Sequence, residues 1–422
     1  MSAIFVHPED HGADAQSLTA ALALARPGDV VLVGPGVSGP SRTGEVLPLR
    51  IPAGVAVEGA GADRCVVDGE GLFEPSFGPI EPELAVVVLG DGCSVSGVMV
   101  TNGGGHGIGA PPGVSATIRD CAITRNGDHG AYLCGVDDVA ILGCTFRENG
   151  LKQYRPTLPR GTGAPQQGHQ IFAEARHGRR NRLTIADNVM QGCFADGVAF
   201  VCFYPEPDGV VFEATIVRNT IEASGRGGLL FACSFGPSGN RQRIVAAGNV
   251  LRGNRQYGIQ AVVASPHADP VPSGNRLEAL FAGNEIVGSP VGIFVRGAGG
   301  ECRGNVGEVV IDRNTISTGE QHAIRIVGAL GVEGVRTADN GLRVVVSRNV
   351  LAGRAPSVAV QAAARVAGSE TLGNEVRVRL LDNRVSGSVE EAFVVSEGVA
   401  GNRVGAEAGS QAHARTDDDL IG

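Results

Sequence analysis

The sequence predicts an all-β solenoid, and three observations support this prediction. An asparagine recurs at nearly constant spacing along the chain, the apolar residues around it alternate with a period of two, and glycine makes up 64 of the 422 residues. A fixed period of about 20–50 residues is typical of repeat proteins, and an apolar period of two indicates strands, not helices. Glycine at this level, without a collagen period, predicts many tight turns.

Each repeat consists of an apolar alternation, a short polar residue, the asparagine, and a second apolar alternation. The steps between successive asparagines are 31, 30, 35, 30, 35 and 34 residues. In two earlier repeats Cys144 and Cys121 take the asparagine position, and Val98 fits it one repeat before them. The asparagines are Asn188, Asn219, Asn249, Asn284, Asn314, Asn349 and Asn383.

One coil per repeat explains this pattern, with a strand, a bend at the asparagine, a second strand, a glycine turn, a third strand and a loop. Stacked coils place equivalent residues about 4.8 Å apart, so the asparagine side chains are expected to form a hydrogen-bonded ladder. Asparagine also tolerates the left-handed backbone that we expect at such a bend. Earlier coils around residues 30–34, 55–59 and 65–69 bring the stack to about a dozen coils.

The open end of a solenoid exposes apolar core and needs a cap. Residues 14–25 have the spacing of an amphipathic helix that ends before Pro27 and Gly28. We therefore predict an N-terminal segment and capping helix over residues 1–29 and a flexible acidic tail over 406–422. The parallel β-helix is predicted over residues 30–405, with long loops at 150–168, 204–212 and 265–276.

At this point the chain resembles the right-handed parallel β-helix, or pectin-lyase-like, superfamily. The resemblance rests on the helix and first strand ending in Val33-Gly34-Pro35-Gly36, on residues 51–61 and on Val66-Val67-Asp68-Gly69. It implies a right-handed solenoid, and the superfamily includes lyases, hydrolases, epimerases, fructotransferases and non-enzymatic modules. No activity family is matched, because Gly105-His106-Gly107 precedes Asp137-Asp138, the reverse of the polygalacturonase order, and Asn-Thr-Asp is absent.

Composition narrows the classes of partner. The net charge of −9 argues against a general nucleic-acid surface or an anionic membrane surface. No apolar run reaches the roughly 18 residues needed to span a bilayer, and residues 1–12 lack the pattern of a signal peptide, so a cytoplasmic location is expected. The cysteines show no C-x₂-C spacing, and neither a resident metal nor a cofactor is expected.

The residue before the second strand of each coil forms the candidate site. In successive coils this position holds His106, His129, His169 and Asp196, which stacking should place about 4.8 Å apart. A row of imidazoles ending in a carboxylate suits proton transfer near neutral pH, and stacked imidazoles should lower one another's pKa by repulsion. Metal ligation and simple capping of turns are the alternatives. The predicted catalytic residues are His129, His169, Asp196 and Glu174.

The outward side chains of the second strand form a face that is unusually apolar for an exposed sheet. Such a face indicates either a subunit interface or a groove for a partly apolar ligand, and we expect a homo-oligomer formed through it. Glu174 is a charged exception on this face and a candidate acid or base. The predicted substrate-binding residues on or beside the face are Tyr132, Phe172, Phe203, Arg226, Tyr257, Gln260 and Arg296.

Three functions remain open from the sequence. The first is a carbohydrate-active enzyme of the lyase, glycoside hydrolase or glycosyl/fructosyl transferase type, which cleaves or rearranges a glycosidic bond by acid/base catalysis. The second is a cofactor-free isomerase, cyclase or lyase that acts on a small, partly apolar metabolite. The third is a non-catalytic binding module, in which the column serves only as turn chemistry. An enzyme acting on a small molecule or oligosaccharide is the expectation.

Overall fold

The computed structural model describes most of the chain. By contacts within the chain it divides into two compact units, unit 1 (Met1–Ala199) and unit 2 (Phe200–Gly422), which we treat one at a time. The described residues are 2–10, 12–71, 81–150, 168–203, 208–265, 271–319, 321–330, 336–353, 357–364, 370–386, 393–396, 403–408 and 413–415.

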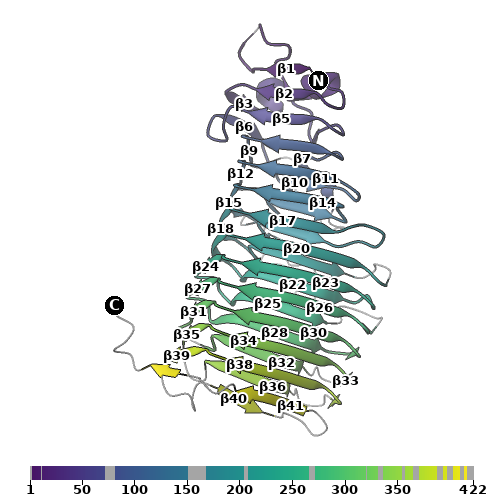
Figure 1. Cartoon of the computed structure of the whole chain (residues 1–422). Helices are drawn as coiled ribbons and strands as arrows, with labels where there is room; N and C mark the ends of the chain where they lie inside the picture. Colours follow the sequence, from purple (N-terminus) through teal and green to yellow (C-terminus); the bar gives the residue numbers. More distant parts are fainter. Residues whose placement is uncertain are drawn as a thin grey trace. The chain divides into compact units, whose positions relative to one another are not determined.

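Unit 1 is built from three parallel sheets, to which each coil contributes one strand (Figure 1). The first sheet holds, in order, β1 (Ala3–Val6), β2 (Val30–Val33), β5 (Ala56–Gly59), β8 (Cys93–Ser96), β11 (Ser115–Arg119), β14 (Asp138–Leu142) and β17 (Arg182–Ala186). The second sheet holds β4 (Leu49–Arg50), β7 (Ala85–Val88), β10 (His106–Ala110), β13 (Ala131–Cys134) and β16 (Ile171–Glu174). The third holds β3 (Gly36–Ser38), β6 (Cys65–Asp68), β9 (Met99–Thr101), β12 (Ala122–Thr124), β15 (Thr145–Asn149) and β18 (Val189–Cys193).

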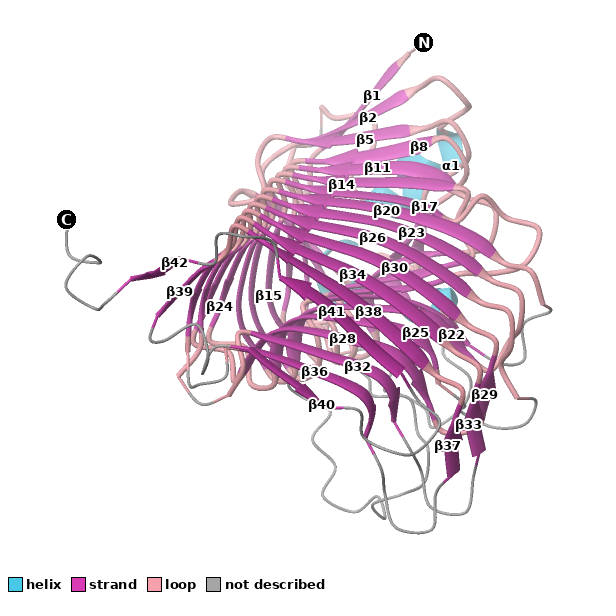
Figure 2. Ribbon diagram, turned by 60° about the horizontal axis from the view of Figure 1, so that its bottom comes forward, coloured by secondary structure: helices cyan, strands magenta, loops and turns pink. Residues whose placement is uncertain are grey.

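Unit 2 repeats the same design with longer strands, and β19 (Val198–Phe203) crosses the boundary in sequence. Figure 2 shows β26, β30, β34 and β38 of its first sheet side by side. That sheet holds β20 (Val211–Val217), β23 (Arg241–Ala247), β26 (Arg276–Ala282), β30 (Val306–Asp312), β34 (Gly341–Ser347), β38 (Glu375–Leu381) and β41 (Arg403–Ala408). The second holds β22 (Gly227–Phe235), β25 (Tyr257–Ala264), β28 (Val291–Gly299), β32 (Ile324–Leu330), β36 (Val358–Ala364) and β40 (Phe393–Ser396).

The third sheet of unit 2 consists of short strands, and a small fourth sheet is added beside the long coils. The third sheet holds β21 (Thr220–Ser224), β24 (Val250–Arg252), β27 (Glu285–Val287), β31 (Thr315–Ser317), β35 (Val350–Ala352), β39 (Arg384–Ser386) and β42 (His413–Arg415). The fourth holds β29 (Cys302–Arg303), β33 (Arg336–Ala338) and β37 (Glu370–Leu372). The all-β parallel solenoid that the repeat predicts is therefore confirmed.

The expected asparagine ladder is confirmed. In unit 2 each Oδ1 from Asn249 to Asn383 accepts hydrogen bonds from the backbone N–H and from Nδ2 of the asparagine one coil earlier, beginning with Asn219. In unit 1 the backbone N–H of Cys144 donates to Asn188 Oδ1 at 2.8 Å. The ladder thus gives hydrogen-bond partners to buried polar groups that the bend would otherwise leave unpaired.

One detail of the bend differs from the expectation. The left-handed backbone falls on the residue before each asparagine, for example Arg218 at φ 55° and Arg313 at φ 54°. Glycine takes this place at Gly248 and Gly283, which lowers the strain. The asparagine itself is needed for its side chain, since the left-handed turn one residue earlier aims the amide into the stack.

The N-terminal cap is shorter than predicted. Helix α1 runs over Leu18–Leu24, because Asp14 accepts the backbone N–H of Phe5 and Ala15 pairs with Val6 in a bridge. The Ser17 side chain caps the helix, and the buried Glu45 accepts the N–H groups of Leu18 and Thr19. Two other short helices are present among the described residues: α2 (Pro40–Thr43) and the 3₁₀ helix η1 (Pro82–Leu84).

The predicted loops and tail are only partly described. Within the predicted loops, residues 151–167, 204–207 and 266–270 lie outside the described residues, while Val211 and Arg276 already begin strands. The predicted tail boundary falls inside β41, and β42 also lies within the predicted tail. Among the described residues, no helix combines the length and the apolar character that a bilayer crossing requires.

Candidate functional site

In the candidate column a glycine follows His106 and His129, whereas Gln170 follows His169. A Cβ on Gly107 would lie 2.6 Å from Asn126 Nδ2, and one on Gly130 would lie 2.5 Å from the carbonyl oxygen of Gln170. Only glycine lets the chain pass this close to its neighbours at the start of β10 and directly before β13. Each histidine before such a glycine is therefore held at a fixed turn, and the turns stack from coil to coil.

The imidazoles of His106, His129 and His169 form the predicted column, and all three are buried. The rings of His106 and His129 are parallel within 6° with centroids 5.1 Å apart, and His169 follows at 5.3 Å. Each Nδ1 accepts a backbone N–H from the same position of the next coil: His129 to His106 at 3.4 Å, His169 to His129 at 3.2 Å and Asp196 to His169 at 3.2 Å. These bonds place the proton of each neutral ring on Nε2.

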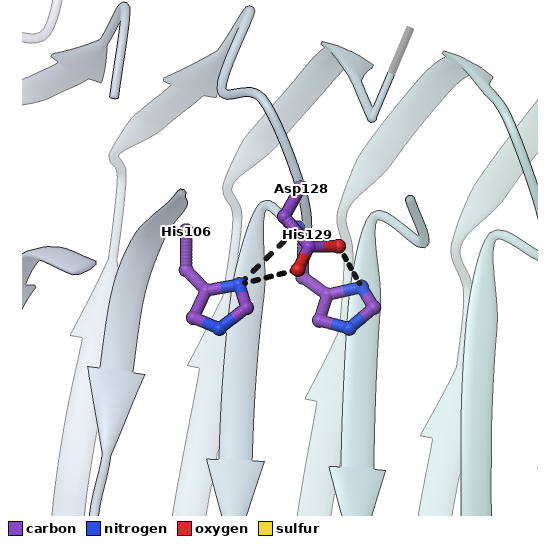
Figure 3. A group of neighbouring side chains, drawn as sticks. All are labelled: His106, Asp128 and His129. Carbon is purple, nitrogen blue, oxygen red and sulfur yellow. Dashed lines mark hydrogen bonds and ion pairs between the residues drawn. The ribbon is translucent and has the colours of Figure 1, made fainter. Parts of the chain in front are cut away.

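Two carboxylates accompany the column. Asp128 lies between the first two rings, with Oδ2 3.5 Å from His106 Nδ1 and Oδ1 3.5 Å from His129 Nδ1 (Figure 3). Its Oδ1 also accepts the backbone N–H of Gly168 at 3.1 Å. Asp196 Oδ2 lies 3.5 Å from His169 Nδ1. The column is therefore a buried row of three imidazoles with a carboxylate beside each end.

Burial sets the charge of this row. It lowers the pKa of His106 to about 3 and keeps the pKa of His129 well below its usual value, with His106 and His169 adding to the shift at His129. Repulsion between neighbouring imidazoles, which is the cause that the sequence predicts, therefore contributes less than burial to the lowered pKa of His129. Burial also raises the pKa of Asp128 to about 7. At neutral pH the imidazoles of His106 and His129 are therefore neutral, and Asp128 is close to its own midpoint.

An aromatic layer covers the imidazoles. Phe172 stacks on His129 at 4.9 Å and on His169 at 5.0 Å, and Tyr132 lies 5.0 Å from His106. Tyr132 and Phe172 are in register on adjacent strands of the second sheet and are both buried. These two predicted substrate-binding residues therefore separate the imidazoles from the outside of the sheet.

Glu174 is the member of the predicted catalytic set that solvent reaches. Its side chain is 12% exposed, whereas His129, His169 and Asp196 are at most 3% exposed. Tyr132 donates its hydroxyl proton to Glu174 Oε2 at 2.8 Å, and Arg176 Nη2 lies 3.1 Å from Oε1. Burial and the Glu174 carboxylate raise the pKa of Tyr132, so the phenol stays protonated.

The sequence analysis missed Arg176. Its position two residues after Glu174 was the available signal, because alternate residues of an extended segment share a face. Arg176 lies beyond the end of β16, and its stem packs against Gly135, where a Cβ would lie 2.5 Å from Arg176 Cγ. The exposed edge of the candidate site thus consists of a phenol, a carboxylate and a guanidinium.

His106, Asp128 and His129 bring three possible metal-ligand atoms within 4.8 Å of one another. Both Nδ1 atoms, however, already accept backbone N–H groups, and the parallel rings keep the two Nε2 atoms from converging on one point. A metal ion would have to replace those backbone contacts. The donor set as folded fits turn capping and proton sharing better than metal binding.

The remaining predicted binding residues belong to unit 2. Tyr257 begins β25, with its ring over Gly227, and Gln260 faces outward in register with Phe294. Both are buried, while Arg226 and Arg296 are half-buried. Phe203 ends β19, and its side chain lies outside the described residues. Within unit 2 the outward Leu230, Ala232 and Val262 are already buried by the chain itself, and a homo-oligomer through this face stays a prediction.

Comparison with known proteins gives one family match. A family model described as a right-handed beta helix region matches residues 85–276. No curated protein matches the chain.

Three solved structures with a similar course of the chain are distant in sequence. A Paenibacillus alginate lyase is 14% identical with a TM-score of 0.43, over 83% of this chain and 96% of its own. A polygalacturonase from Erwinia carotovora is 11% identical with a TM-score of 0.39, over 96% of both chains. PfbA, a surface adhesin of Streptococcus pneumoniae, is 10% identical with a TM-score of 0.39, over 91% of this chain and 88% of its own. The family match over residues 85–276 and the stacked parallel coils of each unit show that the chain has a right-handed parallel β-helix fold.

Proposed function

We propose that the protein is a carbohydrate-active enzyme that cleaves or rearranges a glycosidic bond by proton transfer at Glu174. The observation that supports the proposal is the arrangement of Tyr132, Glu174 and Arg176, with contacts of 2.8 and 3.1 Å at the edge of the buried column. A carboxylate held between a phenol and a guanidinium can accept or return a proton while its neighbours keep it in place. The superfamily includes enzymes that act in this way on sugars, which favours this choice over a small metabolite.

The proposed division of roles follows from burial. Glu174 meets the substrate and moves the proton, Tyr132 donates to Glu174, and Arg176 balances the negative charge. His129, His169 and Asp196 were predicted as catalytic. In this proposal they support Tyr132 and Phe172 from behind, because their rings and carboxylate are buried. Their rigid packing would keep the Tyr132 hydroxyl aimed at Glu174.

A non-catalytic binding module is the second candidate, and one observation favours it. Each imidazole of the column accepts a backbone N–H of the next coil, which gives all three histidines a structural role without chemistry. The two candidates differ in what Glu174 does. In an enzyme its loss removes turnover, while in a module it affects at most the binding of a sugar.

Replacing Glu174 by glutamine is expected to lower turnover by about a hundredfold or more, because the amide keeps the shape but cannot accept the proton. Wild type and variant are assayed on a panel of neutral and acidic oligosaccharides. New reducing ends report hydrolysis, and ultraviolet absorbance of an unsaturated product reports elimination. Glu58→Gln, an exposed site on β5, is the matched control and should leave activity unchanged. Full activity of Glu174→Gln would rule out the proposed role, and sugar binding without turnover in wild type would support the module.

A further inference from the structure

A second feature, confined to unit 2, lies on the outward face of β28. Arg296 faces outward there, in register with Val262 on β25 and Val327 on β32. One residue pair earlier on the same strands, Phe294 is in register with Gln260 and Arg325. The Arg296 guanidinium is thus flanked in register by a valine on each neighbouring strand.

Arg296 has no counter-ion among the described residues. Within the described part of the chain no carboxylate lies within ion-pair distance of its guanidinium, and its Nε is buried without a hydrogen-bond partner. Other arginines of unit 2 are compensated: Arg276 reaches Glu308 at 2.9 Å and Arg348 reaches Asp312 at 2.8 Å. Both of those side chains are about half exposed, so the less exposed arginine is the one without a partner.

The groups around Arg296 do not supply a negative charge. Burial lowers the pKa of Arg296, and the nearby Arg226 lowers it further, while Cys302 and Tyr257 act in the opposite sense. Burial raises the pKa of Cys302 to about 12, so this thiol is neutral at physiological pH. A half-buried cation without a partner is costly to a fold, and an anion that binds to it offsets part of this cost.

The guanidinium is also held in position by backbone packing. A Cβ on Gly299 would lie 3.2 Å from Arg296 Cζ and 3.4 Å from Nη1, so the absence of a side chain there leaves the guanidinium its place. The planar fork of arginine matches a carboxylate or a phosphate with two parallel hydrogen bonds.

We propose that Arg296, with Arg226 beside it, forms an anion-binding site that takes the acidic group of a sugar. That the ligand is an anion is inferred from the unpartnered Arg296 guanidinium. That the anion is part of a sugar rests on the proposed function. The site belongs to unit 2 and does not include Glu174, so binding can be measured independently of turnover.

The test is a thermal-shift and calorimetric titration of the full chain with glucuronate, glucose and inorganic phosphate. Glucuronate should stabilise wild type, and glucose should not. Arg296→Met should weaken glucuronate binding at least about tenfold, because charge-assisted bonds are lost. It should also raise the melting temperature without ligand, because an unpartnered cation is removed. Gly299→Ala keeps the charge, displaces the guanidinium and should weaken binding as well.

Arg325→Met is the matched control, since its guanidinium lies over the Phe294 ring at 5.3 Å on the next strand. It should leave glucuronate binding unchanged. Equal binding by wild type and Arg296→Met, or no stabilisation of wild type by either anion, would overturn the site. Stabilisation by phosphate but not by glucuronate would contradict the assignment of an acidic sugar as the ligand and would support a site for other anions. Because Glu174→Gln should still bind glucuronate, failure of the proposed function would be recognised separately.

Discussion

Replacing Asn284 by alanine is expected to lower the free energy of unfolding by about 4 kcal/mol. The Asn284 side chain accepts from the backbone N–H and from Nδ2 of Asn249, both at 3.0 Å, and donates to Ala246 O and Asn314 Oδ1, both at 2.9 Å. Removing this side chain breaks four buried hydrogen bonds and leaves polar groups on two neighbouring coils without partners. Each polar group that is left unpaired costs roughly 1–3 kcal/mol, since water cannot replace the lost partner.

The measurement is chemical denaturation of the full chain. Asn284→Cys is the informative companion, because Cys121 and Cys144 occupy the equivalent position in unit 1 and donate to carbonyl oxygens there. This cysteine variant should lose clearly less free energy of unfolding than the alanine variant. Val245→Ala, at a 38% exposed position of β23, should cost about 1 kcal/mol or less. An alanine variant as stable as wild type would show that the ladder does not stabilise the stack.

The ladder also shows how much of the fold was readable from sequence. The spacing of Asn219 to Asn383 predicted one ladder, yet Asn240, Asn275, Asn305, Asn340 and Asn374 form a second one with the same bonding. Its steps of 35, 30, 35 and 34 residues repeat those of the first. The signal was present in the sequence, because each of these asparagines directly precedes a strand of the first sheet.

The sequence was enough to predict which residues of the candidate site lie together. It was not enough to predict how deeply they are buried or which groups they contact. Stacking of coils fixed which residues share a column, so His106, His129 and His169 could be placed together from spacing alone. Their burial depends on Tyr132 and Phe172 packing over the rings, and on which atom each Nδ1 meets in the next coil. Those features are set by rotamers and by neighbouring turns, and a repeat pattern carries no information on either.

Acidification is expected to destabilise the protein through the imidazole column. Because the pKa of His106 is lowered to about 3 and that of His129 lies well below 6.5, there is a window below pH 6.5 in which the folded chain stays unprotonated at both positions. The unfolded chain binds a proton at each position in that window. Each imidazole therefore removes about 1.4 kcal/mol of stability for every pH unit below 6.5.

Asp128 acts in the opposite sense. Its pKa is raised from 3.8 to about 7, so its contribution to stability is complete below pH 3.8 and is lost as the pH rises to about 7. Between pH 4 and 6.5 it offsets one of the two imidazoles. The net expectation for wild type is that the column loses about 1.4 kcal/mol of stability for each pH unit of acidification within this window.

Two substitutions should change this dependence in opposite directions. His129→Asn removes one titrating ring, while its amide oxygen can still accept the His169 N–H, so the loss on acidification should nearly vanish. Asp128→Asn removes the offset and still accepts the Gly168 N–H, so the loss should roughly double. Unfolding free energies from denaturant titrations at pH 4.5–7.5 measure both, and groups that titrate elsewhere cancel in the differences from wild type. Parallel curves for the three proteins would mean that the imidazoles take up protons in the folded state, and the column would then be open to water instead of sealed by the aromatic layer.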